Sequence, residues 1–257
     1  MFDDDARAAL AATRFADVRW VEETGSTNAD ALALARDGER EGIVLVADHQ
    51  TAGRGRQGRT WTAPPGASLL TTILLRPPAA VAGLVTMAVA LAASDAVADV
   101  AGFEPRLKWP NDLVWPGDGS APDRKLAGIL AEADWRDGAV AVVAGIGINV
   151  RWPRPLPAEL ADIAIAINHI SERDVEREAL LVALLRRLDR WCGAPDLRAR
   201  WRELSATLGR AVRVELADEA VEGDAIDVDA NGHLVVALAG GGHRTFAVGD
   251  VVHLRPR

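Results

Sequence analysis

The sequence has a single cysteine, Cys192, among its 257 residues. One cysteine cannot form the disulfide framework on which many small secreted domains depend. The acidic start, residues 1–5, also lacks the positive segment and apolar core of a secretory signal peptide. We therefore expect a cytoplasmic protein.

Positive residues are outnumbered by negative ones. The chain has 29 Lys and Arg against 37 Asp and Glu, a formal net charge of -8. This balance argues against general nucleic-acid binding by the whole surface. The uncharged run between Arg76 and Asp95 is short for a membrane span and contains two prolines. It favours a buried helix, so we expect no membrane partner.

No Ser/His/Asp or Cys/His arrangement suggests a nucleophile, and no spacing of His or Cys indicates a metal site. His49 and His169 are isolated, which is typical of ordinary polar or core histidines. Hydrophobic residues make up 49% of the chain and charged residues 26%, so it can bury a core. The length allows one large domain, or a main domain with a smaller one.

One segment, residues 50–61 with the sequence QTAGRGRQGRTW, is strongly positive inside an otherwise acidic chain. Arg54, Arg56 and Arg59 alternate with glycines, and a strand-like apolar run, residues 43–47, precedes them. Glycines let the backbone approach a ligand closely, and arginines offer planar forks of donors to phosphate and carboxylate oxygens. The pattern predicts a loop that wraps an anion, which we interpret as a nucleotide phosphate.

Three other interpretations of this segment are weaker. Its glycine spacing matches a dinucleotide fingerprint, but Trp61, Pro64 and Pro65 follow where a helix should begin, and residues 76–78 include no acidic side chain. A P-loop needs lysine where Arg59 stands. An Arg/Gly patch that binds RNA stays open, although it would be one short patch in an acidic chain.

The hydrophobic pattern predicts an α+β fold, a mixed β-sheet flanked by helices. Polar cap formers place a helix start at Ser26 or Thr27, and Asp137-Gly138 indicates a hairpin turn. Expected helices cover residues 3–14, 79–100, 181–191 and 196–207. Expected strands cover residues 19–22, 43–47, 68–75, 107–109, 113–115, 124–132 and 139–150, with an exposed loop at 116–123.

The pattern changes near residue 208 to short strands with tight turns. Strands are expected at 211–216, 225–228, 233–239 and 244–248, with Asn231-Gly232 as a turn. This predicts a small separate β barrel at 208–257, after a larger domain at 1–207.

Polar clusters interrupt the predicted strands at residues 26–28, 50–61, 108–112, 124–125 and 145–149. Each has an ordinary explanation by itself, such as a helix cap at Ser26 or a solvated strand end at Lys125. Together they lie at the ends of successive strands, where side chains from separate elements can meet. Positive groups beside a glycine-rich backbone favour phosphoryl or nucleotidyl transfer.

These five motifs, in this order, resemble biotin protein ligases of the monofunctional type. The motifs are STN, QTAGRGRQGRTW, KWPND, RKLAGIL and GIGIN, at residues 26–28, 50–61, 108–112, 124–130 and 145–149. The small β domain resembles the family's SH3-like module. The resemblance covers nearly the whole chain and implies a class II synthetase-like catalytic domain.

The resemblance implies a two-step reaction. ATP and biotin give biotinyl-5′-AMP and pyrophosphate, and a lysine of a biotin carboxyl carrier domain then takes the biotinyl group. It implies Mg²⁺ as cofactor and biotin-dependent carboxylases as partners. Only 25 residues precede Ser26, so we expect no specific DNA binding of the kind some relatives show. A lipoate ligase of the same architecture and a non-enzymatic RNA-binding module remain alternatives.

The resemblance also implies roles for individual residues. Biotin contacts are implied for Ser26, Thr27, Asn28, Gln50, Arg54, Gly55, Arg56, Lys125 and Gly128. Nucleotide contacts are implied for Arg56, Arg59, Trp61, Lys108, Asn111, Asp112 and Asn149, with Trp61 stacking on adenine. Lys125, Arg54 and Arg56 would be catalytic, because the first step brings a carboxylate to an anionic phosphate. Asp112 is the expected contact for Mg²⁺.

Overall fold

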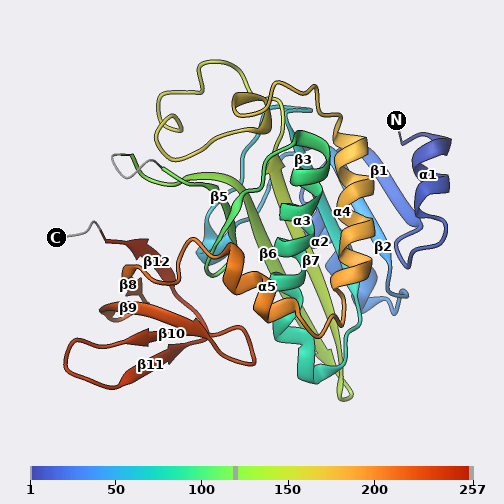
Figure 1. Ribbon diagram of the computed structural model, residues 1–257. Coiled ribbons are helices and arrows are strands. Elements are labelled where there is room, and N and C mark those ends of the chain that lie inside the picture. Colours follow the sequence, from blue (N-terminus) through green and yellow to red (C-terminus); the bar gives the residue numbers. More distant parts are fainter. Residues whose placement is uncertain (1, 118–120, 255–257) are drawn as a thin grey trace.

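A seven-stranded β-sheet forms the centre of the larger part of the molecule (Figure 1). The computed structural model describes residues 2–117 and 121–254. The strand order is β1-β2-β3-β7-β6-β5-β4. Strands β1 and β2 are parallel and the other neighbours antiparallel, so the predicted mixed sheet is confirmed. The strands are β1 Asp17–Thr24, β2 Ile43–Gln50, β3 Ser68–Leu75, β4 Arg106–Lys108, β5 Asp112–Trp115, β6 Arg124–Arg136 and β7 Ala139–Asn149.

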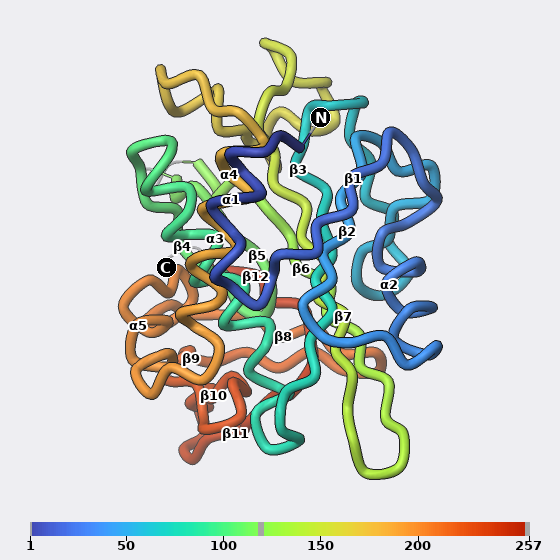
Figure 2. Tube along the Cα trace, turned by 90° about the vertical axis from the view of Figure 1, so that its right-hand side faces the viewer, coloured from blue at the N-terminus to red at the C-terminus, as the bar shows by residue number. Residues whose placement is uncertain are grey.

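Helices cover both faces of this sheet (Figure 2). Helix α2 (Thr27–Arg36) lies on one face, and α3 (Val85–Ala101) and α4 (Arg177–Trp191) lie on the other, with α1 (Asp4–Leu10) beside α4. The leucines of α4 recur at helical spacing and are buried against α3 and the sheet. The expected one-sided helix near 181–191 is therefore confirmed.

Helix α3 is apolar over most of its surface, and most of its residues are buried. With the preceding 3-10 turn it forms the run Ala79–Ala101, which is long and apolar enough to pass as a membrane span by composition. The most apolar stretch of this run is 61% buried inside the structure, between the sheet and α4. A core helix accounts for this pattern.

Several predicted boundaries agree closely with the structure. Strand β3 has the predicted bounds, and Asp137-Gly138 forms the turn between β6 and β7, with φ of 50° and 79°. Positive φ at both turn positions suits a two-residue hairpin. Ser26 is the N-cap of α2, although its side chain makes no capping hydrogen bond. Helices α1 and α5 (Leu197–Leu204) are shorter than expected.

The C-terminal part is a five-stranded antiparallel sheet, which confirms the small β domain. The described pairings run in the order β11-β10-β9-β8-β12. The strands are β8 Ala211–Glu215, β9 Ala220–Val228, β10 Leu234–Ala237, β11 His243–Phe246 and β12 Asp250–His253. Strand β12 was not predicted. Residues 118–120 of the predicted loop at 116–123 lie outside the described residues.

Buried and partly buried polar contacts join the two parts beside the 108–112 segment. The Trp109 backbone N–H donates to Thr207 Oγ1 at 3.0 Å, and its indole Nε1 donates to the Gly232 carbonyl at 3.0 Å. His253 Nδ1 lies 3.1 Å from Asp123 Oδ2. The His253 contact holds the end of β12 close to the larger sheet.

Candidate active site

A cavity of about 530 Å³ opens where α2 stops covering the sheet. Side chains alternate between the two faces of a strand. On β7, Ala141 and Val143 pack under α2, and the next two residues on the same face are Gly145 and Gly147. Because glycine has no side chain, this face of the sheet becomes the floor of the cavity. Its volume lies in the range usual for small-molecule sites.

Two neighbouring side chains require these glycines. A Cβ at Gly145 would lie 1.8 Å from Asn28 Oδ1, and one at Gly147 would lie 2.6 Å from Trp61 Cε2. Both distances are far below van der Waals contact. The GIGIN motif therefore lets Asn28 and Trp61 lie directly on the sheet.

A hydrogen-bond network lines one end of the cavity. Gln50 Oε1 accepts from the Thr27 backbone N–H at 2.8 Å, and Thr27 Oγ1 lies 2.8 Å from Thr72 Oγ1. Thr72 donates to Asn28 Oδ1 at 2.7 Å, and Asn28 Nδ2 donates to Glu132 Oε2 at 3.0 Å. Thr27, Asn28 and Thr72 are buried. The network fixes these side chains before any ligand arrives.

Glu132 connects this network to the arginine loop. Arg54 makes a bidentate contact with the Glu132 carboxylate: Nη2 donates to Oε2 at 2.7 Å, and Nη1 donates to Oε1 at 3.2 Å. The sequence analysis missed Glu132 and Thr72. The sequence did contain a signal for Glu132. Every second residue of a strand lies on the same face, so Leu130 and Glu132 share a face with Gly128, a predicted biotin contact.

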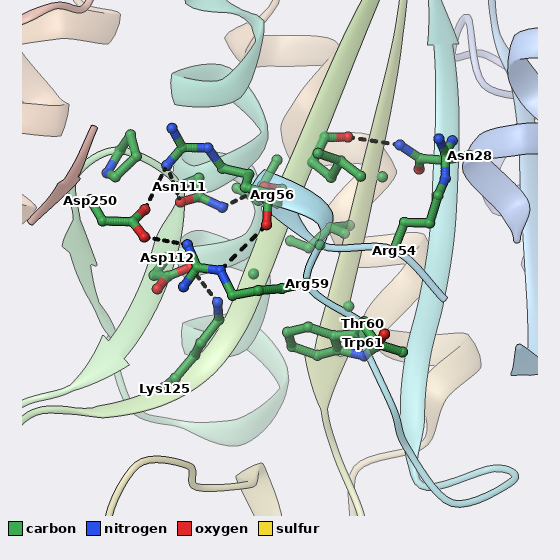
Figure 3. Close-up of a pocket in the computed structure, with 18 of the residues that line it drawn as sticks. Asn28, Arg54, Arg56, Arg59, Thr60, Trp61, Asn111, Asp112, Lys125 and Asp250 are labelled. Carbon is green, nitrogen blue, oxygen red and sulfur yellow. Dashed lines mark hydrogen bonds and ion pairs between the residues drawn. The ribbon is translucent and has the colours of Figure 1, made fainter. Parts of the chain in front are cut away.

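A second group of charges lies at the other end of the cavity (Figure 3). Lys125 Nζ is 2.6 Å from Asp112 Oδ1 and 5.5 Å from the centre of the Trp61 ring. Arg56 Nη1 donates to Asn111 Oδ1 at 3.3 Å, and Asn111 Nδ2 donates to the Ile129 carbonyl at 2.6 Å. Residues from β5, β6 and the arginine loop therefore meet here.

Strand β12 of the C-terminal domain contributes Asp250 to this end. Its carboxylate forms an ion pair with Arg59 and lies 3.5 Å from Arg56 Nη1. Arg56 Nη1 also donates to the Gly249 carbonyl at 3.3 Å. Burial lowers the pKa of the Arg56 guanidinium, and Asp250 partly offsets this effect. The sequence analysis missed Asp250, since nothing in the sequence places β12 beside the loop.

The structure brings together all but one of the residues singled out from the sequence. The cavity is lined by Ser26, Thr27, Asn28, Gln50, Arg54, Gly55, Arg56, Arg59, Trp61, Lys108, Asn111, Asp112, Lys125 and Gly128. Asn149 lies outside this set. Its Nδ2 donates to the Ile165 carbonyl at 3.1 Å, and its Oδ1 accepts from Ser68 at 3.2 Å. A nucleotide contact from Asn149 stays a prediction.

Sequence comparison assigns both parts of the chain. Residues 22–149 match the Biotin/lipoate A/B protein ligase family, and residues 207–254 match the Biotin protein ligase C terminal domain. The chain is 40% identical over 250 residues to the biotin–acetyl-CoA-carboxylase ligase of Mycobacterium tuberculosis, covering 91% of this chain and 88% of that protein. The chain belongs to the biotin protein ligases. The resemblance carried by the five motifs is therefore confirmed.

Two further relatives agree. The chain is 30% identical over 221 residues to the bifunctional ligase/repressor BirA of Bacillus subtilis, covering 82% of this chain and 66% of that protein. Its fold is similar to the biotin protein ligase from Aquifex aeolicus in complex with biotin and ATP. That match has a TM-score of 0.75 and 25% identity, and it covers 93% of this chain and 99% of that one.

Proposed function

We propose that the chain activates biotin with ATP and transfers it to a lysine of a biotin carboxyl carrier domain. A carboxylate oxygen of biotin attacks the α-phosphorus of ATP, and pyrophosphate leaves. The carrier amine then attacks the acyl carbon of biotinyl-5′-AMP, an amide forms and AMP leaves. The observation that carries this proposal is one cavity with a hydrogen-bonding end, a glycine floor and a cationic end. Family membership supports it.

Biotin is proposed to occupy the end of the cavity built from α2 and β2. Ser26, Thr27 and Asn28 are buried there, and Gln50 is held by its bonds to Thr27. Such a group of fixed hydroxyls and amides suits the neutral, polar ureido ring. Gly55 and Gly128 line the path along which the biotin carboxylate would reach the cations.

The cations are proposed to neutralise the two anions that must react. Bringing a carboxylate to a phosphate costs Coulomb energy, and preorganised positive groups remove this cost in the transition state. Arg54, Arg56 and Lys125 line the same cavity from the loop and from β6. Arg59, Lys108 and Asn111 would contact the nucleotide, and Trp61 would stack on adenine.

Magnesium is proposed to bind with the nucleotide. Among the described residues, no group of three or more His, Cys, Asp or Glu could hold a metal ion. Mg²⁺ commonly uses one or two carboxylates together with substrate phosphates. Asp112 fits by its chemistry, because its carboxylate lines the cavity at the cationic end. When bound, the metal would neutralise charge on the departing pyrophosphate.

The partners and location are also proposals. The partner is proposed to be the carrier domain of a biotin-dependent carboxylase, in the cytoplasm. DNA is not proposed as a partner, and the net charge of -8 argues against general nucleic-acid binding by the whole surface. A domain boundary near residue 208 is supported by the second family match, which begins at residue 207.

The decisive test mixes the protein with biotin, Mg-ATP and a carrier domain, and weighs the carrier by mass spectrometry. We expect a gain of one biotinyl group that depends on ATP. A parallel reaction with lipoate in place of biotin tests the alternative ligase. A mass gain with lipoate alone would contradict the proposed substrate, and no gain or ATP use with either acid would favour a binding protein.

A further inference from the structure

We propose that Asp250 of the C-terminal domain takes the place of a nucleotide phosphate in the ligand-free enzyme. Its carboxylate pairs with Arg59 and lies 3.5 Å from Arg56 Nη1. ATP must displace this carboxylate to bind the same arginines. The inference rests on the proposed function, which assigns Arg56 and Arg59 to the nucleotide.

The position of Asp250 is fixed by the turn before it. Gly249 has φ of 140°, and a Cβ there would lie 2.8 Å from Val214 Cγ1 of β8. Residues with a side chain rarely adopt this backbone conformation. The Gly249 carbonyl accepts from Arg56 at 3.3 Å, next to the Asp250 carboxylate. The C-terminal domain therefore presents two adjacent acceptors to the arginine loop.

Each of the other two catalytic cations also has a carboxylate partner in this structure. Arg54 pairs with Glu132 at 2.7 Å, and Lys125 pairs with Asp112 at 2.6 Å. Those carboxylates belong to strands β6 and β5 of the large sheet. Asp250 differs because it comes from the other domain (Figure 3). When a phosphate replaces Asp250, the arginine loop therefore changes its ion-pair partner, and the contact between the two domains changes with it.

The side chains of this ion pair are unevenly exposed. The Arg56 side chain is 21% exposed and that of Asp250 28%, whereas Arg59 is 61% exposed. The contact with Arg56 is thus the better shielded from solvent, so it contributes more than an ordinary surface pair. Its loss is therefore one part of the free energy that ATP binding must overcome.

The direction of the effect follows from thermodynamic linkage. An interaction that exists only in the free state opposes binding by its whole free energy. The Asp250 carboxylate would also repel incoming phosphates at short range. Removing its charge should therefore strengthen nucleotide binding, and it should release the loop before nucleotide arrives.

Asp250→Asn tests this inference, with Glu219→Gln as its matched control. Glu219 pairs with Arg244 inside the C-terminal domain and is not among the residues that line the cavity. Glu219→Gln therefore makes the same change in net charge as Asp250→Asn, but away from the site. We measure the KM for ATP in pyrophosphate release at saturating biotin, the Kd of a non-hydrolysable ATP analogue, and amide exchange at residues 53–61. For Asp250→Asn we expect binding about threefold to tenfold tighter and faster exchange without nucleotide. The control should match the wild type.

Charge-retaining and second neutral variants complete the test. Asp250→Glu keeps the negative charge and should stay close to the wild type. Asp250→Ser is a second neutral variant, and it should show the same tighter nucleotide binding even where Asp250→Asn does not fold. Unchanged or weaker nucleotide binding in the folded neutral variants, with an active wild type, would overturn the inference. A wild type that releases no pyrophosphate from ATP and biotin would instead overturn the proposed function, and the inference with it.

Discussion

Lys125 lies between an anion and an aromatic ring, with Asp112 Oδ1 at 2.6 Å and the centre of the Trp61 ring at 5.5 Å. The carboxylate and the π-face of the indole both attract the Lys125 ammonium group. This amine is therefore held ready, as a cation, at the place where the carboxylate and the phosphate are proposed to meet.

We expect Lys125→Ala to lower the rate of adenylation about 10²–10³-fold, by analogy with the loss of one preorganised donor. The reason is that the negative charge of the transition state would lose a fixed cation. Biotin-dependent pyrophosphate release measures this step. A rate close to that of the wild type would remove Lys125 from the mechanism.

Gly147 tests whether the glycine floor positions Trp61. A Cβ added at Gly147 would lie 2.6 Å from Trp61 Cε2, so Gly147→Ala should push the indole away from the sheet. We expect kcat/KM for ATP to fall about 10–100-fold, because a displacement of about 1 Å in a site can cost that much. Gly240→Ala is the control, since no atom lies within 4 Å of its Cβ position. Equal activity of both variants would show that Trp61 has no role in positioning the nucleotide.

The residues missed from the sequence share a physical cause. Thr72, Glu132 and Asp250 lie on strands and contact the site only through tertiary structure. A threonine in an apolar strand and a carboxylate near a strand end have ordinary explanations in any sequence. The loop and lysine motifs could be found because their composition departs from that of the rest of the chain.

The arginine loop is the element on which binding of both substrates is proposed to depend. Short-range backbone bonds hold it, with Trp61 N donating to the Gly53 carbonyl at 3.0 Å and Arg59 N to that of Arg56 at 3.1 Å. Gln57 within it has φ of 54°, in the left-handed region. Three arginines in one short loop repel each other, and the carboxylates of Glu132 and Asp250 offset this repulsion.

We expect amide exchange at residues 53–61 to slow when biotin and ATP bind. Ligand anions would replace the exchangeable carboxylate partners and order the backbone, which costs about 1–2 kcal/mol per fixed residue. Hydrogen-exchange mass spectrometry with each substrate alone and with both measures the change. Strand β3, buried in the sheet, serves as an internal control. Equal protection with and without substrates would contradict a ligand-ordered loop.

Elements with strong periodicity were predictable, and short ones were not. Strand β3 and the leucine face of α4 follow directly from the pattern of buried residues. Strand β12 has four residues, of which Val251 is the buried one, so its pattern is too short to stand out. It pairs with β8, about 40 residues earlier, and a pairing of that range is decided by tertiary packing.

At the scale of the whole molecule, His253 joins the two domains. It lies 3.1 Å from Asp123 Oδ2 and 3.3 Å from Thr207 Oγ1. Burial lowers the pKa of His253 to about 4, and the positive charges of Lys108 and Arg210 act in the same direction. Asp123 opposes this shift. The histidine is therefore neutral at pH 7.

Acid should weaken this junction. The unfolded chain takes up a proton on His253 near pH 6.5, while the folded chain resists protonation until about pH 4, so stability is lost as pH falls between these values. We expect this residue to lower the free energy of unfolding by about 1–2 kcal/mol between pH 7 and pH 5. Urea unfolding of the wild type and His253→Gln at both values measures it. An identical pH dependence in the two proteins would show that His253 does not carry the effect.

The central claim is that the cations of one cavity exchange their carboxylate partners for the anions of biotin and ATP. A crystal structure with a stable analogue of biotinyl-5′-AMP tests it most directly. The account predicts the analogue phosphate within hydrogen-bond distance of Arg56 and Lys125, the ureido ring beside Asn28, and Asp250 separated from Arg56. An analogue bound outside this cavity, or Arg56 still paired with Asp250 when the analogue is bound, would contradict it.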